Sequence, residues 1–208
     1  MDADHVEIRV LGCLIEKQRT TPDVYPLSLN SLRLACNQST NRDPVVQYDD
    51  PTIRHALDSL SRRGWVRLAS GPGSRAVKFR HLFDEALGLD DSEISLLAVL
   101  MLRGPQTVGE LRQRTERLHR FESAGEVDAV LSALAGRELV EQWPRRPGQK
   151  EDRYVQLLGE GAESAPPPAA GVGEDDRLAE LEAAVGELRN EVAALRTELR
   201  GFGGSEEA

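Results

Sequence analysis

The residues of this sequence best suited to chemistry are the cations and hydrogen-bond donors between positions 37 and 80. Six polar residues stand in a row, Asn37-Gln38-Ser39-Thr40-Asn41-Arg42, and the window 42–80 holds eight Lys or Arg against four Asp. Such a window can bind phosphate although the whole chain carries a formal charge of −9. The polar run has two interpretations: it grips an anion such as DNA phosphate, or it satisfies the backbone groups of its own loop.

The negative charge of the chain is concentrated at its C-terminal end. The net charge is +1 over residues 1–88, −3 over residues 89–160 and −7 over residues 161–208. An acidic whole-chain balance therefore does not exclude nucleic-acid binding by the N-terminal part. Because 23 of the 26 basic residues are Arg, a single Arg is weaker evidence of phosphate contact here than in a chain of ordinary composition.

The elements that must position these residues occur twice. Leu60-Ser-Arg-Arg-Gly-Trp-Val66 aligns with Leu134-Ala-Gly-Arg-Glu-Leu-Val140, and the order of features around the two segments is the same. Each copy predicts three helices followed by a β-hairpin. The fold class is therefore mainly α with small β-hairpins (α+β), built from two tandem winged helix-turn-helix domains over residues 1–88 and 89–158.

Capping signals and apolar periodicity give the predicted bounds. In the first unit, Asp4 and Glu7 cap the first helix, the second helix begins near Ser28, and the third has Asp50 as N-cap and Pro51 as its first residue. Strands are expected over 65–69 and 76–82. The second unit starts at Asp91, has capping boxes at 107–110 and 123–126, and ends in a hairpin over 139–158.

The C-terminal residues predict a linker and a coiled coil. A Pro/Ala/Gly-rich linker covers 159–175, a heptad helix covers 176–200, and a disordered tail covers 201–208. The heptad residues, spaced alternately by three and four, are Leu178, Leu181, Val185, Leu188, Val192, Leu195 and Leu199. Val at the inner a positions with Leu at every d position favours a parallel homodimer. The alternative is a single helix that folds back on its own chain.

Two motifs resemble a known family. YPLSLNSLRLACNQSTNRDPV, from Tyr25 to Val45, and LGCLIEK, from Leu11 to Lys17, are similar to the signature motifs of the YceH-like family of bacterial proteins. The resemblance covers roughly residues 4–158. It implies tandem winged helices, in agreement with the internal repeat, and it supplies no activity, ligand or catalytic residue.

A winged helix that binds DNA usually lays its third helix in the major groove and its hairpin along the phosphates. The residues expected to contact DNA are Arg42, Thr52, Arg54, His55, Arg62, Arg63, Arg75 and Lys78. Arg42 is predicted to face outward towards the ligand, whereas Asn37, Gln38 and Asn41 are predicted to structure the loop. The third helix of the second unit offers acidic and small residues over 128–133, which favours a protein-contact or packing surface.

The remaining residue types point away from other classes. Cys13 and Cys36 are expected to be packing residues in a reducing compartment, and no catalytic, metal or cofactor motif is recognised. The longest apolar run, 96–102, is too short to cross a membrane. The sequence predicts a cytoplasmic, non-enzymatic, dimeric DNA-binding protein of regulatory type. The alternative is a protein-interaction scaffold, similar to the tandem winged-helix accessory subunits of chromosome-condensing complexes.

Overall fold

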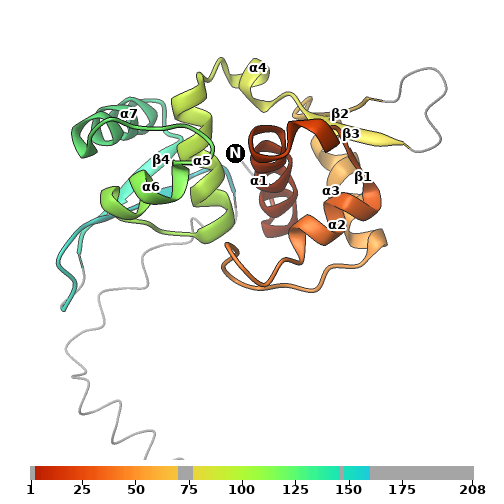
Figure 1. Ribbon diagram of the computed structural model, residues 1–208, viewed down its shortest axis with the longest axis horizontal. Coiled ribbons are helices and arrows are strands. Elements are labelled where there is room, and N and C mark those ends of the chain that lie inside the picture. Colours follow the sequence, from red (N-terminus) through yellow and green to blue (C-terminus); the bar gives the residue numbers. More distant parts are fainter. Residues whose placement is uncertain (1–2, 70–76, 146–147, 160–208) are drawn as a thin grey trace, which may run out of the picture. The chain divides into compact units, whose positions relative to one another are not determined.

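The computed structural model describes residues 3–69, 77–145 and 148–159 (Figure 1). The helices are α1 (His5–Thr20), α2 (Leu29–Cys36), α3 (Asp50–Arg62), α4 (Phe83–Leu87), α5 (Asp91–Arg103), α6 (Val108–Thr115) and α7 (Ala124–Gly136), with a 3₁₀ turn at Pro22–Val24. The strands are β1 (Leu27–Ser28), β2 (Val66–Leu68), β3 (Lys78–His81), β4 (Val140–Trp143) and β5 (Arg153–Gln156). The protein is thus α+β, with small antiparallel sheets.

Side-chain caps fix where the helices begin, because the first N–H groups of a helix have no partner within it. The capping boxes at Asp4 and Thr107 are confirmed, and Asp90 caps α5 one residue before the predicted start. The prediction for α3 is wrong by one residue. Asp49, not Asp50, accepts the backbone N–H of Thr52 at 2.9 Å. At 123–126 only half of the predicted box forms, since Ser123 accepts from the backbone N–H of Glu126 while the Glu126 carboxylate accepts from that of Glu122.

The order of helices and strands is the same in the two halves. In the first, β1 and β2 flank β3 in an antiparallel sheet, with Leu27 and Leu68 on either side of Phe79. In the second, β4 pairs with β5, and an isolated antiparallel bridge from Gln106 to Tyr154 occupies the place that β1 has in the first half. The two-residue strand β1 and the short helix α4 were not predicted.

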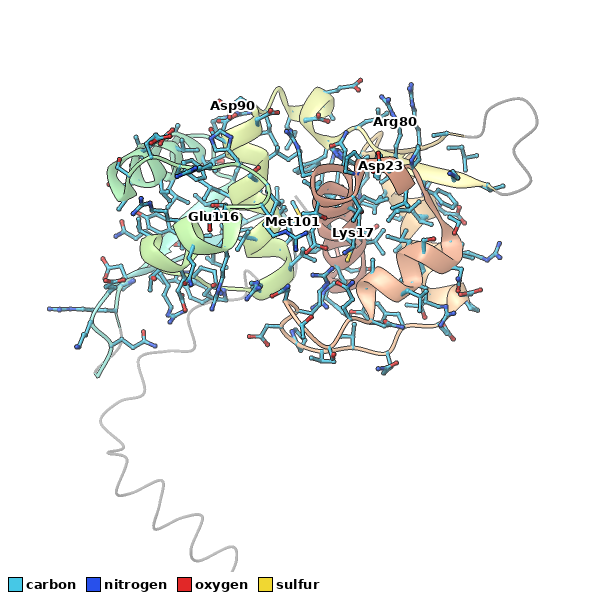
Figure 2. All side chains as sticks on the ribbon, viewed as in Figure 1. Lys17, Asp23, Arg80, Asp90, Met101 and Glu116 are labelled. Carbon is cyan, nitrogen blue, oxygen red and sulfur yellow. The ribbon has the colours of Figure 1, made fainter. Side chains whose placement is uncertain are left out.

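The two halves share one continuous hydrophobic core, whose centre is formed by α1 and α5. Every residue from 7 to 15 on α1 and from 94 to 102 on α5 is buried. Gly12 permits the close approach of these helices, because a Cβ atom there would lie 3.0 Å from Cδ2 of Leu102 and 3.1 Å from Cβ of Met101. Figure 2 shows Met101 on the side of α5 that faces α1.

The residues of the predicted coiled coil lie outside the described part of the chain, as do those of the linker after Gly159 and the predicted tail. Within the described ranges, no helix has the length and apolar character needed to span a membrane.

Candidate nucleic-acid interface

Helix α3 has one buried face and one exposed face. Ile53, Ala56, Leu57 and Leu60 are almost completely buried. The helical period then turns Arg54, His55, Asp58 and Arg62 towards solvent, where all four are exposed, while Thr52 is half-buried. The structure therefore brings four of the predicted DNA-binding residues, Thr52, Arg54, His55 and Arg62, together on one helix.

Two cations on this face have no acidic partner in the described part of the chain. The side chains of Arg54 and Arg62 form no hydrogen bond or ion pair with any described residue. The first turn is different, since Asp50 forms an ion pair at 2.8 Å with Arg33 of α2. Arg54 and Arg62 are thus available to an external anion.

Arg63 was predicted to contact DNA, but its guanidinium is engaged by the protein. It lies 3.7 Å from a carboxylate oxygen of the buried Glu7 and stacks over Trp65, with its central carbon 5.5 Å from the ring centroid. Trp65 in turn packs edge-on against Phe83. Arg63 therefore holds the C-terminal end of α3 against the core.

The β2–β3 hairpin has a basic side and an apolar side, because side chains alternate along a strand. Arg67 is paired with Arg80, and Lys78 shares their side of β3. Arg80, labelled in Figure 2, forms an ion pair at 2.8 Å with Glu85. The predicted contact Arg75 lies in the part of the hairpin that the structure does not describe.

The other side of the hairpin carries apolar residues that sequence reasoning missed. Leu68 is paired with Phe79, and Val77 lies two residues from Phe79 on the same side. Leu68 is 62% exposed and Val77 is 54% exposed. The only sequence signal for this surface was the alternation of apolar and basic residues over 77–80.

The prediction that Arg42 faces outward is wrong, because its side chain is fully buried. Its guanidinium donates to both carboxylate oxygens of Glu16, at 3.1 and 2.6 Å. It also donates to the backbone oxygens of Ala35 and Asn41, at 3.1 and 2.8 Å, and to the side-chain oxygen of Gln38 at 2.9 Å. Arg42 therefore fastens the polar run to α1 and is not exposed to a DNA ligand.

The side chains of Asn37 and Gln38 bond within the loop, and that of Asn41 bonds the loop to α5. The Asn37 side chain donates to the backbone oxygen of Tyr48 and accepts from its backbone N–H, both at 2.8 Å. Asn41 has a φ of 59°, a left-handed conformation that Asn tolerates better than most residues. Its side-chain oxygen accepts from Arg103 of α5, and the backbone N–H of Asp43 donates to the oxygen of Leu102 at 2.9 Å. The polar run and the residue after it are thus hydrogen-bonded to α5, in the second half of the chain.

Two α1 partners of this loop, the buried Arg9 and the largely buried Glu16, were also missed by sequence reasoning. Burial raises the pKa of Glu16, but the hydrogen bonds and charge of Arg42 outweigh burial, so the pKa is lowered and the carboxylate stays ionised. Arg9 donates to the backbone oxygens of Pro44 and Cys36, at 2.7 and 3.3 Å. The available signal was the single charge of Arg9 within the otherwise apolar run 8–15; Glu16, which is followed by Lys17, had no such signal.

The corresponding helix of the second half, α7, has a different surface. Asp128, Ala129, Ser132 and Ala133 are exposed, and Asp128 accepts a hydrogen bond from the Tyr154 hydroxyl at 3.1 Å. No cation lies on the exposed face of α7 itself. Cys13 and Cys36 are buried free thiols, and no cluster of three or more His, Cys, Asp or Glu suited to a metal occurs among the described positions.

Comparison with known proteins gives one consistent family. Residues 3–149 match the profile described as "Protein of unknown function, DUF480". The chain is 48% identical over 199 residues to a UPF0502 protein of Dechloromonas aromatica, covering 92% of this chain and 91% of the relative. A UPF0502 protein of Geotalea daltonii is 50% identical over 189 residues, with 86% of each chain covered. A third, from Pelobacter propionicus, is 47% identical over 215 residues, with 98% of each chain covered.

Proposed function

The chain belongs to the DUF480 family, and we propose that it is a regulatory protein that binds double-stranded DNA by placing α3 in the major groove. The family description assigns no activity, so the proposal rests on the chain's own fold and charge. The single observation that carries it is the exposed face of α3, where Arg54 and Arg62 have no acidic partner among the described residues.

The order of elements supports a pair of winged helix-turn-helix domains. In each half, two helices precede the helix that leads into a two-stranded hairpin, and a short strand or bridge pairs with the second hairpin strand. In this class of domain the third helix reads the major groove. By this assignment α3 and α7 are the corresponding helices, and only α3 carries unpaired cations.

The spacing of Arg54 and Arg62 suits contacts with separate sites on a duplex. They are eight residues apart, which is about 12 Å along the helix axis at 1.5 Å per residue. The two side chains therefore reach different base pairs or phosphates of one groove. Thr52 precedes Arg54 near the N-terminus of α3, and His55 follows it; both are placed to contact base edges.

The proposal is tested by fluorescence anisotropy of the intact chain on a labelled duplex over a range of salt concentrations. Changing Arg54 and Arg62 together to Ala is expected to weaken binding and to lower the slope of log affinity against log salt by about two, since two phosphate contacts are lost. The matched control is the double change of Arg145 and Lys150 to Ala, which removes the same charge from the second hairpin. A larger loss in the control than in the α3 variant would contradict the assignment.

A protein-interaction scaffold is the second candidate, favoured by the apolar side of the β2–β3 hairpin. Leu68 and Val77 are both more than half exposed, and neighbouring exposed apolar side chains are typical of protein-contact surfaces. Retention of partners from lysate with and without nuclease separates the two functions. DNA binding makes retention nuclease-sensitive, whereas the scaffold makes it nuclease-resistant and dependent on Leu68 and Val77. In either function we propose a cytoplasmic homodimer formed through the heptad residues from 178 to 199.

A further inference from the structure

A second charged region of the protein lies away from α3, where the polar loop meets α5, α6 and β5. It is a cavity of about 250 Å³. Its lining residues are Asn41, Arg42, Asp43, Arg103, Pro105, Gln106, Glu110, Arg114 and Arg153. Four arginines face two carboxylates, so the lining has a net charge of +2.

The internal ion pairs leave one of these arginines without a carboxylate. Arg42 is paired with Glu16, while Arg153 and Arg114 share Glu110 at 3.0 and 3.4 Å. Arg103 forms its hydrogen bond with the neutral side-chain oxygen of Asn41, and none of the described acidic residues forms an ion pair with it. Arg103 is thus the one arginine of this lining that has no carboxylate partner among the described residues.

Like charges lie close together in this cavity, and an anion would offset them. Burial, followed by the charges of Arg114 and Arg42, lowers the pKa of Arg103. The buried Gln106 does not add to the anion site. Its side-chain nitrogen donates to the backbone oxygens of Arg103 and Pro105, and its side-chain oxygen is an acceptor that bonds to no described residue.

We propose that this cavity binds a compact phosphorylated anion of about diphosphate size, held by Arg103, Arg114 and Arg153. Guanidinium groups donate two parallel hydrogen bonds to phosphate oxygens, and three of them around one cavity match a multiply charged anion better than a monoanion. A volume of about 250 Å³ admits such an anion. The cavity is independent of the proposed DNA contacts, since none of its lining residues belongs to α3.

The bound anion would join three elements of the second half, beside the polar loop of the first. Arg103 ends α5, Arg114 lies on α6 and Arg153 lies on β5, whereas Asn41 and Asp43 belong to the loop between α2 and α3. The anion would add charge-assisted hydrogen bonds among α5, α6 and β5. The expected consequence is stabilisation of the folded protein that grows with the logarithm of the ligand concentration above the dissociation constant.

The test uses pyrophosphate as probe, with the intact chain, by isothermal titration calorimetry and thermal unfolding at constant ionic strength. Pyrophosphate is expected to bind at one site and to raise the melting temperature more than sulfate or chloride does. Changing Arg103 and Arg114 together to Gln should weaken binding by about ten-fold or more, because the charge-assisted hydrogen bonds of two guanidinium groups are lost. The single-charge control is Arg120→Gln, at an exposed position outside this cavity, and it should leave binding unchanged.

A second variant keeps the proposal testable if the double variant folds poorly. Glu110→Gln removes the carboxylate that competes for Arg114 and Arg153, while Gln still completes the capping box at Thr107. It should bind pyrophosphate several-fold more tightly than the wild type. Absence of binding to the wild type, equal effects of pyrophosphate and sulfate, or weaker binding by Glu110→Gln would each overturn the proposal. Loss of pyrophosphate binding in the Arg54/Arg62 variant would overturn the independence of the two sites.

Discussion

Replacing Arg42 by Ala is expected to destabilise the fold strongly, although this residue belongs to the most polar stretch of the chain. Its side chain is fully buried and donates five hydrogen bonds, two of them to Glu16. The Ala variant leaves the Glu16 carboxylate, whose side chain is only 14% exposed, without its buried guanidinium partner and with only the ion pair to Lys17 at 3.4 Å among the described residues. Breaking a buried ion pair by removing one partner costs roughly 3–5 kcal/mol. For a chain of this size, that cost lowers the melting temperature by roughly 6–20 °C.

The assay is urea and thermal unfolding of wild type, Arg42→Ala, Glu16→Gln and the double variant. The double variant should lose less unfolding free energy than the two single variants lose in sum, because it removes both charges of the pair and leaves neither of them buried without its partner. The control is Arg54→Ala, which removes the same charge from an exposed position and should change stability by about 0.5 kcal/mol or less. A melting temperature of Arg42→Ala within experimental error of wild type would refute the buried-anchor assignment.

The same pair has a predicted pH dependence. The pKa of Glu16 is lowered in the folded protein, so the folded state binds its proton less readily than the unfolded state does. Its contribution to stability is therefore complete above the unfolded pKa of about 4.3 and is lost as pH falls through the folded value. The difference in unfolding free energy between wild type and Arg42→Ala should shrink correspondingly in acid.

Three further outcomes are expected. Asn37→Ala should cost about 1–3 kcal/mol in urea unfolding, because it leaves the backbone groups of Tyr48 unpaired, whereas Thr40→Ala, at an exposed position, should be nearly neutral. Burial lowers the pKa of His81 to about 4, so folding favours the neutral imidazole. Between pH 7 and pH 4 the wild type should therefore lose on the order of 3 kcal/mol more stability than His81→Gln. Parallel pH profiles of the two proteins would contradict this. In sedimentation, the intact chain should be dimeric and a chain ending at Gly159 monomeric, because the heptad residues are then absent; identical behaviour of the two would exclude the heptads as the dimerisation element.

Local signals in the sequence were sufficient for the longer helices, but not for the five-residue α4, which has no side-chain N-cap. Asp4 with Glu7 and Thr107 with Glu110 pair over three residues, so the start of each helix depends on neighbours that the sequence places side by side. The one-residue error at α3 arose because Asp49 and Asp50 are both good N-caps, and the choice depends on how the preceding loop reaches the helix. The two-residue strand β1 exists only through its pairing with β3, which follows about fifty residues later, and it therefore has no local signal.

The direction of Arg42 was not predictable for a related reason. A charged residue in a polar loop is exposed in most proteins, and it is buried only where a carboxylate at the right depth compensates it. That carboxylate, Glu16, is 26 residues earlier in the chain, within a helix whose apolar neighbours gave no sign of a polar contact. The polar run therefore contained enough information to predict hydrogen bonding, but not which partners would accept it.

The contact between α1 and α5 depends on the absence of a side chain at Gly12, which leads to a last prediction. In an exposed helix, replacing Gly by Ala stabilises by roughly 0.5–1 kcal/mol. At Gly12, however, a new Cβ would lie 3.0 Å from Cγ and Cδ2 of Leu102 and 3.1 Å from Cβ of Met101. The Met101 Cβ cannot move without its helix, and Leu102 is packed in the core. Gly12→Ala should therefore destabilise by about 1–3 kcal/mol in urea unfolding, as overpacked cores do. Gly136→Ala on α7, where no heavy atom lies within 4 Å of the new Cβ, is the matched control and should be neutral or stabilising. Equal stabilisation by both changes would show that α1 and α5 are not held at this spacing.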